Sequence, residues 1–254
     1  MSERQALSEA VNNPDLLPRF ANIASRIPAA ADGAEVGELL AEAVVLLGAD
    51  AGAFASFMKD DEHDSSYRFI LACDPAWCLE YENGACFMHD PWISYARHYS
   101  EPTLASRIVA RTERERQVVA MARRYGFQST LIVPAHSPQG LTRLGGLCIG
   151  SSQPAYFDGD GLAAVAFAAT PLAMRLHEWQ VAQLRRELLD RAQLSETDIL
   201  LLRHARAGQR SKQSAAVLKV NPVSIDSHWQ RLNARLGVNS RISAANMAAE
   251  YGVI

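Results

Sequence analysis

Three residues that are able to bind a small polar group stand close together between positions 77 and 90. Trp77 and Tyr81 are four residues apart, so a helix places both rings on one face. Each ring has a polar tip that needs a partner when it is buried. Asp90 precedes Pro91, which holds the backbone of Asp90 extended and suits the first position of a helix. The spacing indicates two donors and one carboxylate acceptor within a short stretch of chain.

This set is complementary to a ligand that has two carbonyl groups and an amide N–H. A carboxylate that accepts from such an N–H makes a charge-assisted hydrogen bond, which contributes ~1.5–3 kcal/mol. The alternative interpretation is an ordinary core in which the two rings pack together and Asp90 caps a helix. The spacing alone leaves both interpretations open.

The first 190 residues show the periodicities of a mixed α and β domain. Helices are expected over residues 35–47, 76–81, 113–125 and 158–190, and strands over residues 51–58, 67–72, 130–134 and 144–151. Pro171 is expected to kink or break the last of these helices. The order of elements predicts an α+β domain, with a central antiparallel sheet covered by helices on both faces (an α-β-α sandwich).

The last sixty residues have the pattern of a helix-turn-helix domain. Ser195 is placed to cap a helix that stops near Gly208, and a second short helix covers residues 212–218. Asn221 and Pro222 are suited to the N-cap and first position of a third helix. The third helix has one apolar stripe, formed by Ile225, Trp229, Leu232 and Leu236. A short helix followed by one with a polar outward face is typical of a recognition helix for the DNA major groove.

The distribution of charge supports DNA binding. Residues 191–254 contain nine Lys or Arg and four Asp or Glu, a net charge of +5. The whole chain has a net charge of −3, so residues 1–190 carry −8. This asymmetry favours a basic domain that contacts phosphate, joined to a domain that does not touch nucleic acid. The alternative is a small helical bundle with a solvated basic face.

A length of 254 residues suggests two domains. We expect a ligand-binding and dimerisation domain over residues 1–188, a linker over 189–193 and an all-α DNA-binding domain over 194–254. No uninterrupted apolar segment approaches eighteen residues, so no membrane span is expected. The N-terminus lacks the basic and apolar regions of a signal peptide, which favours a cytoplasmic protein.

The cysteines and histidines predict neither a metal site nor an enzyme. Cys73, Cys78, Cys86 and Cys148 lack the paired short spacings of structural zinc sites, so reduced thiols are expected. The seven histidines are scattered and form no recognisable catalytic set, and there is no glycine-rich phosphate loop. No cofactor is expected. His228 is expected to be a packed, hydrogen-bonded core histidine.

Together the two halves resemble the LuxR-type quorum-sensing regulators, which sense acyl-homoserine lactones and bind DNA as dimers. The resemblance runs from about residue 20 to the end. It depends on the Trp77, Tyr81 and Asp90 spacing and on further segments. These are residues 123–127, 132–134 and 145–150, with Leu194, Ser195, Asp198, Gly208, Ile225, His228, Leu236, Gly237 and Val238.

The resemblance implies a role for each residue of the first motif. The Trp77 indole N–H would meet a lactone carbonyl, Asp90 would accept from the amide N–H, and Tyr81 would lie near the amide carbonyl. Three positions depart from the family. Ala105 stands where a second Trp usually walls the lactone, Cys148 where a hydroxyl residue is common, and Trp92 where a small side chain borders the ligand. We expect Trp92 to fill part of the room vacated at Ala105 and to narrow tolerance for long acyl tails.

The DNA-binding half departs from the family at Asp226, where Lys is common. An acid there accepts from cytosine or repels phosphate. The expected phosphate contacts are Lys212, Arg231 and Arg235. The residues expected to face the bases are Ser224, Asp226, Ser227 and Gln230.

The resulting hypothesis is a homodimeric transcription regulator that binds operator DNA in response to a small-molecule autoinducer. Two alternatives stay open: a LuxR-type regulator that is ligand-independent or senses a non-lactone molecule, and an anti-regulator that dimerises with a working regulator and binds DNA weakly. The dimer contact is expected to include the helix that carries Leu172, Leu176, Trp179, Leu184 and Leu188.

Overall fold

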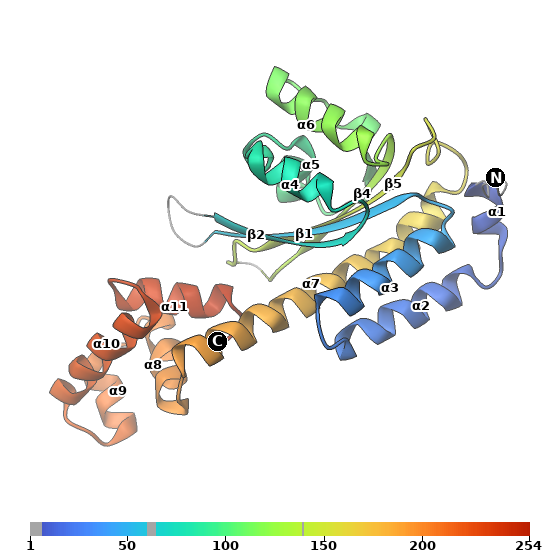
Figure 1. Cartoon of the computed structure of the whole chain (residues 1–254). Coiled ribbons are helices and arrows are strands. Elements are labelled where there is room, and N and C mark those ends of the chain that lie inside the picture. The colour runs from blue at the N-terminus through green and yellow to red at the C-terminus, as the bar shows by residue number, and fades with distance from the viewer. Residues whose placement is uncertain (1–6, 60–64, 139) are drawn as a thin grey trace. The chain divides into compact units, whose positions relative to one another are not determined.

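The computed structural model describes residues 7–59, 65–138 and 140–254, and it divides into two compact units (Figure 1). The first unit extends to Trp179 and the second begins at Gln180, with residues 140–142 grouped with the second. This division by packing falls earlier than the expected domain boundary at residue 188. The functional division, with its linker at residues 189–193, stays a prediction.

The first unit is built on one antiparallel sheet of five strands in the order β2-β1-β5-β4-β3. The strands are β1 (Ala51–Lys59), β2 (Ser65–Ala72), β3 (Thr103–Leu104), β4 (Ser129–His136) and β5 (Leu144–Ser151). β1 pairs with β2 on one side and β5 on the other, so that Phe54 lies between Ile70 and Leu147. Four of the strands were predicted. β3 was missed because two residues are too few to show an alternating pattern.

Helices cover both faces of this sheet, which confirms the predicted α-β-α layering (Figure 1). One face carries α2 (Leu16–Arg26), α3 (Gly33–Leu46) and the first part of α7 (Leu162–Ala192). The other face carries α4 (Ala76–Asn83), α5 (Pro91–His98) and α6 (Glu113–Arg124). The remaining short elements are α1 (Leu7–Asn12), η1 (Ile27–Ala29), η2 (Cys86–Met88) and η3 (Ala105–Arg107).

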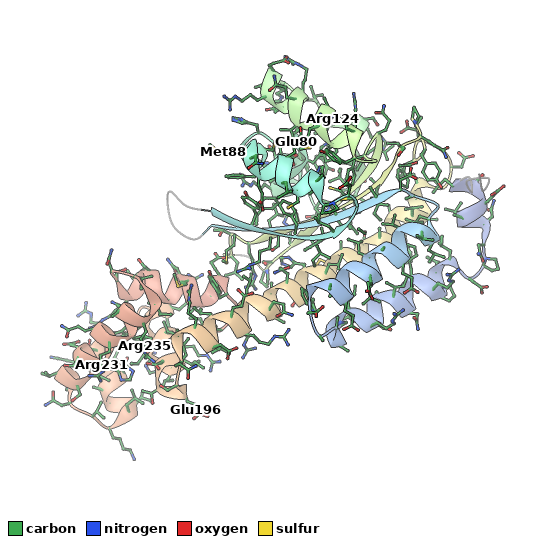
Figure 2. The ribbon with its side chains drawn as sticks, in the orientation of Figure 1. Glu80, Met88, Arg124, Glu196, Arg231 and Arg235 are labelled. Carbon is green, nitrogen blue, oxygen red and sulfur yellow. The ribbon has the colours of Figure 1, made fainter. Side chains whose placement is uncertain are left out.

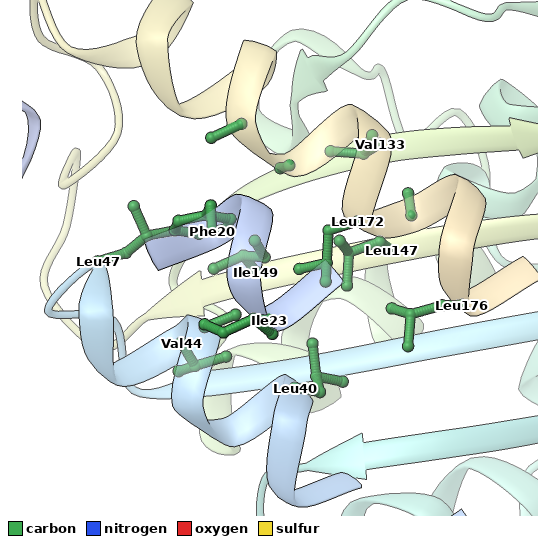
Figure 3. Packing of buried hydrophobic residues seen from close by; sticks show 14 of the residues in the cluster. Phe20, Ile23, Leu40, Val44, Leu47, Val133, Leu147, Ile149, Leu172 and Leu176 are labelled. Carbon is green, nitrogen blue, oxygen red and sulfur yellow. The ribbon is translucent and has the colours of Figure 1, made fainter. Parts of the chain in front are cut away.

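The face under α2, α3 and α7 forms a solid hydrophobic core (Figure 3). Leu172 and Leu176 from α7 pack over Leu147 of β5, and all three side chains are fully buried. Close packing of this kind resists deformation, because each displaced side chain loses many contacts at once. This face therefore serves as a fixed support for the opposite one.

Helix caps in the sequence set the ends of the elements. The Asp32 carboxylate accepts from the backbone N–H groups of Ala34 and Glu35 at 3.0 Å and starts α3. Thr112 and Glu115 form a reciprocal capping box that starts α6. Gly126 follows α6 with a φ of 93°, a conformation that glycine adopts without steric cost.

α7 runs without a break through Pro171, so of the expected kink or break the break is wrong and the kink stays a prediction. A proline inside a helix costs about 3 kcal/mol. Here Ala169 and Leu172, close to Pro171 on either side, are fully buried in the core against the sheet. The free energy of burying that face offsets the missing hydrogen bond and keeps the helix continuous.

Whether α7 forms the expected dimer contact stays a prediction, and the five residues that mark this helix lie on its buried side. Leu172, Leu176 and Trp179 belong to the core of the first unit, and the Trp179 indole N–H donates to the Ala30 carbonyl at 3.2 Å. Leu184 and Leu188 are buried as well. All five side chains are therefore buried within one chain.

The second unit contains the end of α7 and four short helices. They are α8 (Glu196–Arg206), α9 (Ser211–Leu218), α10 (Pro222–Leu236) and α11 (Arg241–Glu250). The predicted caps at Ser195 and Asn221 are confirmed, as is the apolar stripe of α10. α11 was not predicted, because the residues that it buries are all alanines: Ala244, Ala245, Ala248 and Ala249. Within the ranges described, no helix is long and apolar enough to cross a membrane.

Candidate functional site

The face of the sheet under α4 and α5 encloses a small chamber. Its floor is made of small residues: Ala53 of β1 lies opposite Cys148 of β5, and Ala55 lies opposite Gly146. Its walls are aromatic: Phe57, Phe69, Trp77, Tyr81, Trp92 and Phe127. The positions of the aromatic rings, rather than the backbone, therefore determine the size of the chamber.

Trp77 and Tyr81 face this chamber from α4, as their spacing predicts. Their ring centroids are 5.0 Å apart, and the Phe69 ring contacts each of them edge-on, at 5.3 Å and 5.4 Å. Glu80 lies on the same helix and pairs with Arg124 of α6; both residues are labelled in Figure 2. The Tyr125 hydroxyl also donates to Glu80 at 2.8 Å, so α4 is tied to α6 by polar contacts.

Asp90 satisfies both interpretations of its position. As the N-cap of α5, its Oδ1 accepts from the backbone N–H of Trp92 at 2.8 Å and of Ile93 at 3.3 Å. Its Oδ2 accepts from the Tyr81 hydroxyl at 2.8 Å, and the carboxylate lines the chamber. Burial raises the pKa of Asp90 above its usual range, and these hydrogen bonds only partly offset the effect. Asp90 is therefore a helix cap that also presents an acceptor to the chamber.

Two indole N–H groups in the chamber wall have no partner. Trp77 and Trp92 are each only 6% exposed, and the Nε1 atoms of both are buried. Within the described part of the chain, the other buried side-chain atoms without a hydrogen bond are His177 Nδ1 and Asn233 Oδ1. A buried donor without an acceptor is costly and rare in folded proteins. Two such donors in one chamber point to a ligand that brings acceptors.

The enclosed volume of the chamber is only about 30 Å³. That is room for about one water molecule, whereas ligand pockets commonly measure about 300 Å³ or more. The aromatic rings occupy the rest of the space above the sheet. A ligand of ordinary size therefore binds only if some of these rings move.

The two remaining chamber positions behave differently. Cys148 lines the floor, and burial raises the pKa of its thiol far above the usual range, so it stays a neutral thiol. Ala105, in η3, is half-buried and packs against the same hydrophobic cluster, but it is not among the residues that line the chamber. The structure thus brings together Trp77, Tyr81, Asp90, Trp92 and Cys148 and leaves Ala105 outside. Whether Trp92 replaces the ring missing at Ala105 stays a prediction.

Sequence reasoning missed the floor and half of the rings. Ala53, Ala55 and Phe57 alternate along β1, so they share one face of the sheet. The run of small residues on that face was the available signal, since a strand that faces a solid core rarely carries them. Phe127 packs on β5 at Gly150, where an added Cβ would lie 2.5 Å from the ring.

All four cysteines are free thiols. Cys73, Cys78 and Cys86 are half-buried, and burial raises the pKa of Cys73 to about 12. Thiols with raised pKa values are poor nucleophiles and poor metal ligands at neutral pH.

In the second unit, α9 and α10 form the helix-turn-helix. Most of the residues expected to contact DNA are exposed: Lys212, Ser224, Asp226, Ser227, Gln230 and Arg231. Figure 2 labels Arg231 on this unit. The Ser227 hydroxyl donates to the Val223 carbonyl within α10 at 3.2 Å, so its oxygen stays able to accept. These side chains form one polar set that begins at α9 and follows α10.

The sequence predicted that Asp226 faces the DNA bases, but in the structure its carboxylate is hydrogen-bonded within the second unit. Its Oδ1 accepts from the Arg241 guanidinium at 2.6 Å and from the Ser211 hydroxyl at 2.9 Å. These bonds hold the pKa of Asp226 below its usual range. Arg241 also lies over the Trp229 ring at 5.4 Å. The carboxylate thus links the start of α9 to α11 and neutralises one basic residue.

Arg235 was expected to contact phosphate, but the structure gives it an internal role. Its guanidinium donates to the carbonyls of Ala192 and Gln193, at 3.2 Å and 2.9 Å, and to Asp198 Oδ1 at 2.8 Å. His228 Nε2 lies 2.6 Å from the same oxygen, as expected for a hydrogen-bonded histidine. Burial raises the pKa of Asp198, but the bonds from Arg235, the Ser195 backbone and His228 outweigh it and hold that pKa well below its usual range.

A sheet with an aromatic chamber, continued by a helix-turn-helix unit, defines a two-part architecture. A model of the autoinducer-binding domain family matches residues 32–179, more than half of the chain. The chain therefore belongs to the autoinducer-binding domain family. Among curated proteins, none matches the chain by sequence.

Solved structures share the fold. SdiA in complex with octanoyl-rac-glycerol has a TM-score of 0.70 at 15% identity, over 95% of this chain and 97% of that one. SdiA from Escherichia coli in another crystal gives 0.69 at 15% identity, over 94% and 99%. CepR2 from Burkholderia cenocepacia, an N-acylhomoserine lactone-dependent LuxR-family transcription factor, gives 0.57 at 15% identity, over 68% and 98%. The SdiA likeness spans both units of this chain.

Proposed function

We propose that this protein is a DNA-binding transcription regulator of the quorum-sensing type, which responds to an acyl-homoserine lactone or a related acyl amide. One observation carries the ligand part: the unpartnered Trp77 indole N–H shares a chamber with the Asp90 carboxylate. Together they offer one donor and one acceptor in an apolar surrounding, which suits a lactone carbonyl and an amide N–H. The family membership supports the same class of ligand.

The small volume of the chamber supports a switch rather than a preformed site. The free protein fills the chamber with its own rings, and the ligand stabilises a state in which the rings have moved. A ligand shifts such an equilibrium only by its difference in affinity for the two states. We propose that the ligand-bound state is the one that binds operator DNA as a homodimer in the cytoplasm.

The DNA-binding part rests on α10 and the start of α9. Arg231 and Lys212 are exposed and basic, and we assign them to phosphate contacts. Ser224, Ser227 and Gln230 are exposed and polar, and we assign them to the bases. Arg235 leaves this set because its guanidinium is bound within the unit. Asp226 affects DNA binding by neutralising the charge of Arg241.

A second ligand class is favoured by the chamber itself. SdiA has been solved with octanoyl-rac-glycerol, a ligand with several acceptor oxygens and no amide N–H. The two unpartnered indoles of this chain require acceptors, whereas only Asp90 requires a donor. An acylglycerol satisfies both requirements, because its hydroxyl groups donate to a carboxylate.

The test begins by selecting a DNA sequence that the full chain binds, from a random duplex library, in the presence of both probe ligands. Fluorescence anisotropy then measures the affinity for that duplex without ligand, with N-octanoyl-homoserine lactone, and with 1-octanoyl-rac-glycerol. We expect at least one ligand to tighten DNA binding in the wild type. Trp77→Phe, which keeps a ring and removes the N–H, should reduce that ligand response.

Three outcomes would each contradict a different part of the proposal. Equal DNA affinity with and without either ligand would leave a ligand-independent regulator. Ligand binding without any selected DNA would leave an anti-regulator that acts through a partner. Full response to ligand in Trp77→Phe would remove the indole from the recognition of the ligand.

A further inference from the structure

The sequence predicted that the Trp77 N–H binds the ligand, whereas it predicted only that the Trp92 ring fills space. Trp77 matches the resemblance, but Trp92 stands at a position where a small residue is usual. Its ring lines the chamber, and its Nε1 is buried without an acceptor. Both indoles lie against the same ring, with centroids 5.9 Å and 6.5 Å from that of Phe127. Two indoles with unpartnered N–H groups therefore line one part of the chamber, from α4 and from α5.

The proton of Tyr81 is already used. The sequence assigned Tyr81 to the amide carbonyl of the ligand, which requires its hydroxyl to donate there. In the structure that hydroxyl donates to Asp90 Oδ2 at 2.8 Å. A hydroxyl has only one proton, so Tyr81 cannot donate to a ligand while this bond exists. The second donor must come from another residue.

Asp90 keeps capacity for one further bond. Its Oδ1 already accepts two backbone N–H groups, and its Oδ2 accepts one hydroxyl. A carboxylate oxygen has room for two hydrogen bonds, so Oδ2 is able to accept one more. The polar groups that the chamber offers to a ligand are therefore the indole N–H of Trp77, the indole N–H of Trp92 and one lone pair of Asp90.

We propose that Trp92 is a specificity-determining donor, which binds a second acceptor oxygen of the ligand in the role that the sequence assigned to Tyr81. This inference rests on the proposed function. A ligand that satisfies the chamber carries two acceptor oxygens and one donor group. In an acyl-homoserine lactone the lactone carbonyl meets Trp77, and the second oxygen is either the amide carbonyl or an oxygen on the acyl chain.

The experiment observes the indole N–H groups directly. The full chain contains four tryptophans, and labelling each Nε1 with nitrogen-15 gives four signals in a proton–nitrogen correlation spectrum. Trp92→Phe and Trp77→Phe assign the two chamber signals by their disappearance. Trp179 serves as the internal reference, because its N–H is bonded to the Ala30 carbonyl at 3.2 Å, outside the chamber. The probes are N-octanoyl-homoserine lactone and its 3-oxo form, with binding measured separately by calorimetry.

We expect the N–H signals of Trp77 and Trp92 to move downfield on binding, with the Trp179 signal unchanged. If both probes move Trp92, its partner is the amide carbonyl; if only the 3-oxo probe does, its partner is the chain oxygen. Binding that moves Trp77 but leaves Trp92 in place with both probes overturns this inference and leaves the proposed function intact. Failure of both probes to bind overturns lactone sensing and this inference with it.

The variant Trp92→Phe tests the same bond by affinity. Loss of one neutral hydrogen bond should weaken binding of the preferred probe by about 2- to 12-fold. Trp179→Phe is the matched control, because it makes the same change at an indole whose N–H is bonded to the Ala30 carbonyl, outside the chamber. A Trp92→Phe protein that binds both probes as tightly as the wild type contradicts the assignment.

Discussion

Each unit contains an aspartate with several hydrogen-bond partners, half-buried in the case of Asp90 and buried in the case of Asp198, and the two differ in what those partners are. Asp90 receives a hydroxyl and two backbone N–H groups but no cation, and its pKa is raised. The Asp198 carboxylate contacts Arg235 and His228 and accepts from Ser195, the N-cap of α8, and its pKa is lowered. Asp90 keeps one lone pair that is able to accept a hydrogen bond from a ligand. Asp198 is saturated and holds its unit together. The comparison teaches that hydrogen-bond partners, rather than burial alone, separate a binding carboxylate from a structural one.

The largest effect is expected from Asp198→Asn. The Asp198 side chain is 2% exposed, and its removal leaves Arg235 and His228 without their shared partner. Breaking a buried ion pair costs about 3 kcal/mol or more, and Arg235, which is 35% exposed, places this pair at the lower end. Hydrogen exchange of the amides of α8 and α10 should rise accordingly. Glu196→Gln, a change at an exposed acid of the same helix, should leave exchange unchanged.

Asp90→Asn should weaken ligand binding and leave the stability of the fold nearly unchanged. Asn is as good an N-cap as Asp, and it removes the cost of a buried charge, so the free energy of unfolding should change by less than about 1 kcal/mol. Ligand affinity should fall by about 10- to 150-fold, because a charge-assisted bond is lost. Calorimetry with the probe that binds the wild type measures the affinity, and thermal unfolding measures the stability. Glu82→Gln, at an exposed acid of α4, is the control. Equal losses of stability and affinity would make Asp90 a structural residue like Asp198.

The pH dependence should distinguish the two carboxylates. Asp198 has a folded-state pKa below its ordinary value of 3.8, so it stabilises the fold above that pH and loses the effect as pH falls. The difference in unfolding free energy between the wild type and Asp198→Asn should be constant from pH 7 to pH 5. Below pH 4 it should shrink by about 1 kcal/mol per pH unit. For Asp90, whose pKa is raised, the sign is opposite: Asp90→Asn should gain on the wild type as pH rises through the Asp90 titration.

Arg231→Ala should weaken DNA binding uniformly. Arg231 is exposed on α10, and a residue that contacts phosphate contributes to binding of every sequence. The slope of log affinity against log salt concentration should fall by about one. A change of sequence preference with an unchanged slope would assign Arg231 to the bases instead. Arg235→Lys provides the contrast, since its effect should appear in stability and not in the salt slope.

The smallest effect is expected from Asp226→Asn. The pair of Asp226 with Arg241 is exposed, so it contributes little to stability. Its loss leaves the charge of Arg241 uncompensated and adds one net positive charge to the unit. DNA binding should tighten modestly at low salt, and the effect should vanish at high salt. Weaker binding at low salt would instead make Asp226 a contact to a base.

The sequence predicted most of the elements whose burial is periodic and missed elements whose burial shows no pattern. Four strands, the helices α4 and α6 and the apolar stripe of α10 followed from spacing, and the start of α5 followed from Asp90 and Pro91. β3 is too short, and α11 buries only alanines, so neither shows a pattern. α1 and α2 were not predicted either, although α2 buries Leu16, Phe20 and Ile23 at helical spacing.

The candidate site was predictable as far as it depends on neighbours in the chain. Trp77 and Tyr81 share a helix face whatever the tertiary structure, and Asp90 is bound to lie near Pro91. The partners of Tyr81 and Arg235 depend on rotamers and on distant carbonyls, such as that of Ala192, forty-three positions before Arg235. Such contacts leave no mark in local spacing, which is why the Tyr81 proton and the Arg235 guanidinium were both assigned to other partners.

The floor of small residues has a kinetic consequence. Ala53, Ala55, Gly146 and Cys148 place little side-chain volume on this face of the sheet, below Trp77, Tyr81 and Trp92. In the switch proposed above, the rings move before a ligand enters, and this opening is a step in which the ligand takes no part. The observed association rate should therefore rise with concentration and then level off at the opening rate. Bulkier floor residues, such as Ala55→Val, would change that plateau and leave every hydrogen bond of the binding reaction in place.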